Sequence, residues 1–263
     1  MLSSISRLTV SRLLAAIWLA VLVSAGGCQQ RPPVASDEEG DIFASILEPI
    51  TPKSPGEVAR DAFNTYDPDL RRQSITRLAM ADFGGEQPYL RLYRLVMDDP
   101  DPTVRAACVR ALGMHGEVDD ARLVAVRLDD TSPYVRWEAA RALQRLYHPE
   151  VIAALAKALA EDDDPDVRIA AADALGQYAY PHAFQALVVG LADPNFTVVL
   201  AARQSLSTLI GQDLGADPAD WLTWAEQQGD QMFAGRQPYT QRTYAPRRSW
   251  MQHLMIWDQP ATQ

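Results

Sequence analysis

Apolar and polar positions along the chain recur with a period of 31 to 34 residues. Each copy starts with Asp, Ser or Asn, usually followed by Pro, and reaches an aliphatic residue three positions later. We call these aliphatic residues the markers; they are Leu70, Val104, Val135, Val167 and Val198. A fixed period of this length is typical of stacked supersecondary units and argues against a single closed core.

The residues after each marker follow the spacing of one helical face. A small residue comes four positions after the marker and a leucine comes eight positions after it, and these two positions share a helical face with the marker. Asp, Ser and Asn accept hydrogen bonds from the free amides of a helix start, and Pro suits the first helical position. Each copy therefore predicts a helix that starts just before its marker; we call these the marker helices.

A second set of helices is predicted between the marker helices. Ser54 and Glu57 have the spacing of a capping box, with Pro55 between them. Further apolar faces span residues 88–96, 118–128, 149–159 and 181–191, and a last helix opens at Asp217-Pro218 and carries Trp221, Leu222 and Trp224. The pattern predicts an all-α superhelix of five helical hairpins and one closing helix over residues 54–228.

The repeated strings also resemble a known family. Val-Arg-x-x-Ala-Ala-x-Ala-Leu occurs at residues 135–143 and 167–175, and paired aspartates such as Asp98-Asp99 and Asp129-Asp130 lie in the turns. These motifs resemble the HEAT repeat, and the short period is similar to the bacterial variant first associated with phycobilin lyases. The resemblance implies an α-solenoid whose marker helices line the concave side, with a ladder of turn aspartates and marker-adjacent arginines. Val199 replaces the arginine in the fifth copy, so the ladder is expected to stop there.

Charge is distributed unevenly along the 263 residues, whose net charge is −10. Residues 67–228 carry 15 basic and 25 acidic side chains, whereas residues 229–263 carry four basic and two acidic ones. A solenoid with net negative charge lacks the basic surface that binds a phosphate backbone, so the sequence argues against nucleic acid as a partner.

The N-terminal residues have the pattern of an export signal. Arg7 and Arg12 precede an apolar run over residues 13–23, which is shorter than a membrane-spanning helix and has the length of a signal peptide's apolar segment. Small residues then lead to Cys28, a pattern that resembles the lipobox of bacterial lipoproteins, in which the cysteine is diacylated; an ordinary cleaved signal is the alternative. Gln29 follows Cys28 in place of a retaining Asp, so the periplasmic face of the outer membrane is the expected location.

Two segments flank the repeats. With residues 1–27 as the signal peptide, residues 28–53 are expected to form a lipidated cysteine and a solvated tether. Residues 229–263 combine aromatic and basic side chains, and we expect this tail to dock on the solenoid, although a membrane surface or a partner would also suit it.

Candidate chemistry is sparse. Two His-x-Glu pairs, His115-Gly116-Glu117 and His148-Pro149-Glu150, suggest a metal site, with His182 one repeat further on. However, the three histidines lie 11, 13 and 15 residues past their markers, so they drift out of phase. No phosphate-binding loop or nucleophile motif is present. We therefore expect no metal, no cofactor and no catalysis; a lyase-like or metal-dependent enzyme remains an alternative through the family resemblance.

The position two residues past each marker is the most promising surface. It is expected to point away from the core, and in the last three copies it is large and apolar: Trp137, Ile169 and Leu200. Arg110 and Arg141 lie close by, and an apolar strip edged by arginines is typical of a protein or peptide groove. The sequence therefore predicts a non-catalytic, lipid-anchored scaffold that binds a protein or peptide along the concave face of the solenoid, through these residues. A purely structural envelope lipoprotein is the second alternative.

Overall fold

The computed structural model describes residues 53–234, and within this range it holds helices and no strand. No helix among these residues has the length and apolar character needed to cross a membrane. The helices are α3 (Pro55–Asp61), α4 (Pro68–Met80), α5 (Gln87–Val96), α6 (Pro102–His115), α7 (Asp120–Ala125), α8 (Pro133–Leu143), α9 (Ile152–Glu161), α10 (Pro165–Leu175), α11 (Pro181–Gly190), α12 (Phe196–Ile210) and α13 (Pro218–Gln228). Three short 3-10 helices complete them: η1 (Val126–Asp129), η2 (Pro149–Val151) and η3 (Gly229–Gln231).

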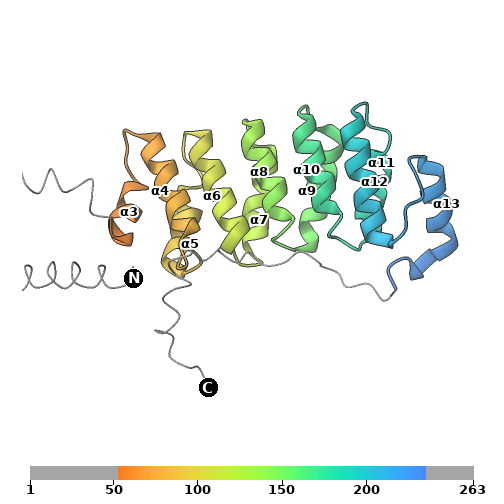
Figure 1. Ribbon diagram of the computed structural model, residues 1–263, viewed down its shortest axis with the longest axis horizontal. Helices are drawn as coiled ribbons and strands as arrows, with labels where there is room; N and C mark the ends of the chain where they lie inside the picture. Colours follow the sequence, from red (N-terminus) through yellow and green to blue (C-terminus); the bar gives the residue numbers. More distant parts are fainter. Residues whose placement is uncertain (1–52, 235–263) are drawn as a thin grey trace, which may run out of the picture. The chain divides into compact units, whose positions relative to one another are not determined.

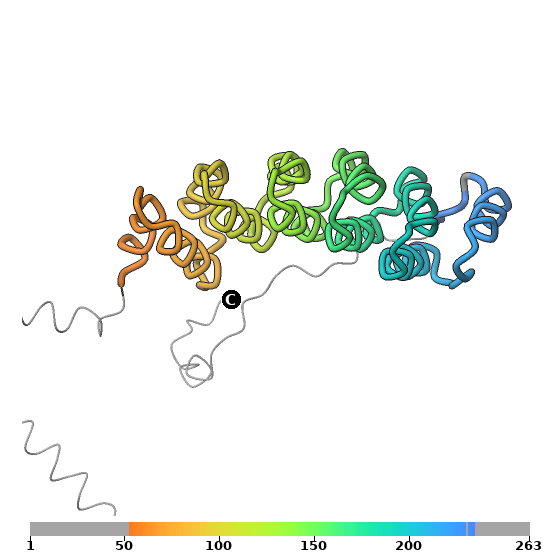
Figure 2. Tube along the Cα trace, turned by 90° about the horizontal axis from the view of Figure 1, so that it is seen from above, coloured from red at the N-terminus to blue at the C-terminus, as the bar shows by residue number. Residues whose placement is uncertain are grey.

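The helices pair into hairpins that follow one another in a row (Figure 1). Within each hairpin an intervening helix packs on a marker helix, as α3 does on α4 and α11 on α12. The marker helices α4, α6, α8, α10 and α12 also contact one another in sequence, and Figure 2 shows the repeated hairpins from above. The predicted architecture of five hairpins and a closing helix, an all-α solenoid, is confirmed.

Most marker helices start with the predicted cap. Asp67, Asp101, Asp164 and Asn195 each accept a hydrogen bond from a backbone amide in the first turn of their helix. Ser132 is the exception, because its side chain caps nothing. The start of α8 is held instead by the Ser132 carbonyl, which accepts from two backbone amides at 3.1 Å.

One intervening helix is shorter than its apolar pattern predicts. The pattern indicated a helix over residues 118–128, whereas α7 starts at Asp120 and gives way to the 3-10 helix η1 at Val126. Asp120 explains the late start, since its buried carboxylate accepts the Glu117 amide at 2.8 Å and fixes a turn before the helix.

The core consists of the aligned faces of the marker helices. All five markers' downstream leucines are buried: Leu78, Leu112, Leu143, Leu175 and Leu206. Helices α6 and α8 approach most closely where a Cβ added at Gly113 would lie 2.7 Å from the Cβ of Ala142. This close approach brings the side chains of α6 and α8 within reach of one another on the solvent side of the contact.

Candidate functional site

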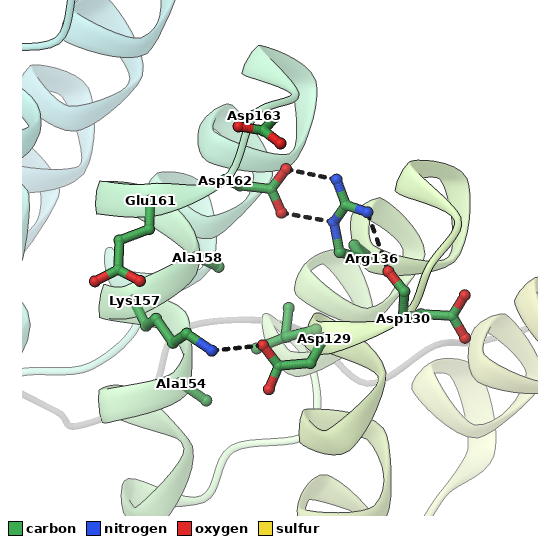
Figure 3. Close-up of a pocket in the computed structure, with 10 residues that line it drawn as sticks. Asp129, Asp130, Arg136, Ala154, Lys157, Ala158, Glu161, Asp162 and Asp163 are labelled. Carbon is green, nitrogen blue, oxygen red and sulfur yellow. Dashed lines mark hydrogen bonds and ion pairs between the residues drawn. The ribbon is translucent and has the colours of Figure 1, made fainter.

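Arginine–aspartate pairs join successive hairpins at the turns that precede the marker helices. The Nε and Nη2 atoms of Arg136 donate to the two carboxylate oxygens of Asp162 at 2.7 and 2.8 Å. The Nη1 atom of Arg136 donates to the backbone carbonyl of Asp130 (Figure 3). Three further pairs have the same geometry: Arg71–Asp99, Arg105–Asp130 and Arg168–Asp193. The predicted ladder therefore exists, and Val199 occupies the position where a fifth arginine would stand.

The ladder aspartates also organise the turns. Each accepts the backbone amide two residues later; for Asp162 the donor is the amide of Asp164, at 2.9 Å. Burial alone would raise the pKa of Asp130, but the hydrogen bonds from Arg105 and the Ser132 amide outweigh burial, and the pKa lies below its ordinary value. The pKa of Asp193 is lowered in the same way by Arg168 and the Asn195 amide.

These lowered pKa values predict acid sensitivity. An aspartate whose folded-state pKa lies below its ordinary value of 3.8 stabilises the fold fully above that value, and the contribution is lost as the pH falls through it. We expect the free energy of unfolding to change little between pH 7 and about pH 5 and to fall steeply below about pH 4. Urea titrations at several pH values measure this, and a stability that rises between pH 5 and 3.5 would contradict it.

A pocket of about 280 Å³ lies beside the ladder between the third and fourth hairpins (Figure 3). Its charged walls are largely engaged, because Lys157 pairs with Asp129 at 2.7 Å and Arg136 pairs with Asp162. Glu161 and Asp163 add exposed carboxylates. The pocket is thus bounded by inter-repeat ion pairs that engage Lys157, Asp129, Arg136 and Asp162.

The marker helices present a second surface, formed by the positions two, six and ten residues past each marker. On α6 they are the buried Ala106, then Arg110 and Met114, and on α8 and the turn that follows it they are Trp137, Arg141 and Arg145. On α10 and α12 they carry mainly smaller or uncharged ones: Ile169, Asp173, Gln177, Leu200, Gln204 and Thr208. On α4 they carry Arg72, Thr76 and Met80, and Arg72 pairs with Asp69 on the same helix. Most of the positive charge of this surface therefore lies on the second and third hairpins.

A buried carboxylate anchors this region. Glu138 on α8 is only 3% exposed and accepts a hydrogen bond from the Nε of Arg110 on α6 at 2.9 Å. The Nη2 of Arg110 also bonds to Glu138 and donates to the hydroxyl of Tyr134 at 2.6 Å. The Glu138 hydrogen bonds raise the pKa of the Arg110 guanidinium. Arg110 is thus held across the two helices in one position.

Aromatic rings extend the same cluster. The ring of Tyr134 stacks on that of Trp137, with centroids 6.1 Å apart and planes 20° apart. The guanidinium of Arg141 lies over the Trp137 ring, 4.6 Å from its centroid. We call Arg110, Tyr134, Trp137, Glu138 and Arg141 the α6–α8 cluster. Next to it, a pocket of about 220 Å³ is lined by residues of α4, α6 and α8.

The structure brings together three of the five predicted binding residues. Arg110, Trp137 and Arg141 belong to one cluster, whereas Ile169 and Leu200 occupy the equivalent position on the next two marker helices. Leu200 is 48% exposed.

One expectation needs correction. The position two residues past the marker does not point simply away from the core: Ala106 is fully buried, and Trp137 and Ile169 are half-buried and pack against the core. The close approach of neighbouring marker helices places this position in the groove between them.

Sequence reasoning missed Tyr134 and Glu138. A signal for Glu138 was present, because the equivalent residue in three other copies is an alanine: Ala107, Ala170 and Ala201. A charged residue at a position that is otherwise buried alanine requires a partner, and Arg110 supplies it.

Comparison with known protein families gives a match in the middle of the chain. The family described as HEAT repeats matches residues 121–207. These residues are therefore similar to HEAT repeats. The match spans the third to fifth hairpins and includes both Val-Arg-x-x-Ala-Ala-x-Ala-Leu strings, and the described part of the chain is a HEAT-like solenoid. No curated protein matches the chain.

Two solved structures are similar to this solenoid. The crystal structure of an engineered protein is 18% identical over 69% of this chain and 92% of its own, with a TM-score of 0.47. Human deoxyhypusine hydroxylase in complex with glycerol is 16% identical over 69% of this chain and 93% of its own, with a TM-score of 0.33.

The histidines of the solenoid lie in different structural settings. The Nε2 of His115 lies 2.7 Å from the carbonyl of Ala79, the Nδ1 of His148 accepts the Glu150 amide at 3.3 Å, and His182 is exposed. Glu150 pairs with Arg122 and Glu117 pairs with Arg94. Among the described residues, no three His, Cys, Asp or Glu side chains gather in a metal-binding group.

Cys108 lies inside α6 as a buried free thiol. Burial raises the pKa of its thiol far above the ordinary value, so the thiolate is disfavoured. Cys108 is thus a small packing residue, as its place in the helical face predicts. Cys28, the tether and residues 235–263 of the tail lie outside the described residues.

Proposed function

We propose that this protein is a non-catalytic scaffold that holds a protein or peptide on the marker-helix surface of its HEAT solenoid. The observation that carries the proposal is the α6–α8 cluster. Tryptophan, tyrosine and arginine are the residues that most often dominate binding energy at protein interfaces. Here all three are gathered on two neighbouring marker helices, α6 and α8.

The cluster is also pre-organised. Arg110 is fixed by Glu138, Trp137 is packed on one side by Tyr134, and Arg141 rests on the Trp137 ring. Side chains that already occupy one rotamer lose little conformational entropy on binding, so more of their contact energy contributes to affinity. A surface of this kind suits recognition without chemistry.

The lyase-like and metal-dependent alternative has less support. It depended on the family resemblance and on the His-x-Glu pairs, and the carboxylates of those pairs are engaged by arginines.

We further propose that Cys28 carries a lipid that anchors the scaffold at the periplasmic face of the outer membrane. The support is the apolar run, the small residues and Gln29 around Cys28. Two acyl chains give stable anchoring, whereas one gives marginal binding. Metabolic labelling with a fatty-acid analogue should mark the wild type and leave Cys28→Ser unlabelled. Labelling of both proteins, or of neither, would contradict the anchor.

Cross-linking in cells, followed by mass spectrometry, tests the scaffold. We expect the wild type to capture a reproducible set of neighbours, of which some are lost in Trp137→Ala and in Ile169→Asp, because both changes alter the marker-helix surface. The matched control is Leu123→Ala, which truncates an exposed apolar side chain on α7. If every variant captures the same neighbours, the marker-helix surface is not the binding site.

A further inference from the structure

The pocket beside the α6–α8 cluster carries positive charge within an acidic solenoid. Residues 53–234 contain 17 lysines and arginines and 28 acidic residues. The pocket nevertheless has three arginines and one acid in its lining, which is formed by Met80, Arg110, Met114, Glu138, Arg141, Ala142 and Arg145. The pocket therefore differs in sign from the solenoid as a whole.

Arg141 is the arginine best placed to bind a ligand. Its guanidinium lies over the Trp137 ring, 4.6 Å from the centroid, and no described residue accepts a hydrogen bond from its N–H donors. Among the described residues Arg141 forms no ion pair. Asp173 on α10 interacts with it electrostatically, but no hydrogen bond joins the two side chains.

Arg110 has a different role. Its Nε and Nη2 atoms are already bound to Glu138 and Tyr134, so its charge is largely balanced. It holds α6 and α8 in register and fixes Tyr134, which in turn supports Trp137. Arg110 is thus a positioning residue for Arg141.

Methionines supply the apolar part of the pocket. Met80 at the end of α4 is 60% exposed, and Met114 near the end of α6 lies 9% exposed beneath the arginines. Methionine side chains adapt to ligands of different shape. At about 220 Å³ the pocket has room for a side chain and none for a folded element.

Resting on the proposed scaffold function, we infer that this pocket binds an extended acidic segment of a partner protein. One carboxylate of the segment accepts the edge donors of Arg141 in a bidentate pair, and a neighbouring apolar side chain packs on Met80 and Met114. Arginine is suited to this role because its planar fork matches a carboxylate. A basic segment is disfavoured by the three arginines.

The negative charge of the rest of the solenoid makes binding of the acidic segment selective for this pocket. An acidic segment is repelled by the carboxylates along the turns and attracted by the arginines of the second and third hairpins. Its position along the solenoid is therefore fixed by charge, and its affinity should fall as salt rises.

Fluorescence anisotropy with defined peptides tests the inference on the full chain in detergent. The probe is a labelled eight-residue peptide of alternating Glu and Leu, compared with analogues that carry Gln or Lys in place of Glu. We expect saturable binding of the Glu peptide, and a loss of about tenfold or more for the Gln analogue and for Arg141→Gln. The matched control, Arg203→Gln, removes an arginine of α12 that pairs with Asp213 and should leave binding unchanged.

Several results would overturn the inference. They are equal binding of the Gln analogue, tighter binding of the Lys analogue, equal losses in the two arginine variants, or no saturation at millimolar peptide. Binding that appears only after residues 236–263 are deleted would assign the pocket to the chain's own tail instead. If cross-linking from the cluster captures a partner through a segment without acids, this inference fails while the scaffold function stands.

Discussion

Asp162→Ala should lower the free energy of unfolding by about 3 kcal/mol, because it leaves a largely buried guanidinium without its partner. The side chains of Arg136 and Asp162 are 17% and 6% exposed, and two hydrogen bonds join them. The substitution also removes the acceptor of the Asp164 amide. Urea unfolding followed by circular dichroism measures the change.

The neighbouring residue provides a matched control for this prediction. Asp163 is exposed, and its carboxylate makes no hydrogen bond or ion pair with any described residue. Asp163→Ala should therefore change stability by less than about 0.5 kcal/mol. The double variant Arg136→Met with Asp162→Leu should recover much of the loss, since an apolar pair replaces a buried ion pair at little cost. Equal effects of Asp162→Ala and Asp163→Ala would show that the ladder contributes nothing specific.

Trp221→Ala should detach the closing helix, with a loss of about 3 to 5 kcal/mol in the stability of that end of the solenoid. Trp221 is the buried residue of α13; it packs against Phe184 of α11, and its indole N–H donates to the Gly215 carbonyl at 2.9 Å. Because each repeat contacts only its neighbours, the effect should stay local. Hydrogen exchange should show faster exchange in α13 and α11, with α6 unchanged.

Leu222→Ala is the control at the same helix. Leu222 follows Trp221 directly but is 48% exposed, so its truncation should leave the exchange rates of α11 unaltered. Uniformly faster exchange throughout the solenoid in Trp221→Ala would mean that the repeats unfold as one unit, contrary to the nearest-neighbour account.

Much of this fold follows from local rules that a sequence displays directly. The helix starts could be predicted because Asp-Pro combines a capping side chain with a fixed φ. The number of hairpins followed from the period of the markers. The ladder was expected only from the resemblance to the HEAT repeat. Boundaries were less readable: the late start of α7 depends on Asp120 and Glu117, whose pairing with Arg94 crosses between hairpins.

The candidate site was readable only in part. Trp137 and Arg141 lie four residues apart on one helix, so their contact follows from helical spacing. Arg110 meets Glu138 across 28 residues, and that contact depends on the distance between α6 and α8, which Gly113 and Ala142 set. The sequence pattern of a single helix does not give the distance between α6 and α8. For that reason Glu138 and Tyr134 were missed.

The central claim is that the marker-helix surface at α6 and α8 binds a protein partner. The most direct measurement is photo-cross-linking in cells from a benzophenone amino acid at position 137, with position 123 on α7 as the control. The account predicts a discrete adduct from position 137 that disappears in the Arg141→Gln background and has no counterpart from position 123. The same adducts from both positions, or none from position 137, would contradict it.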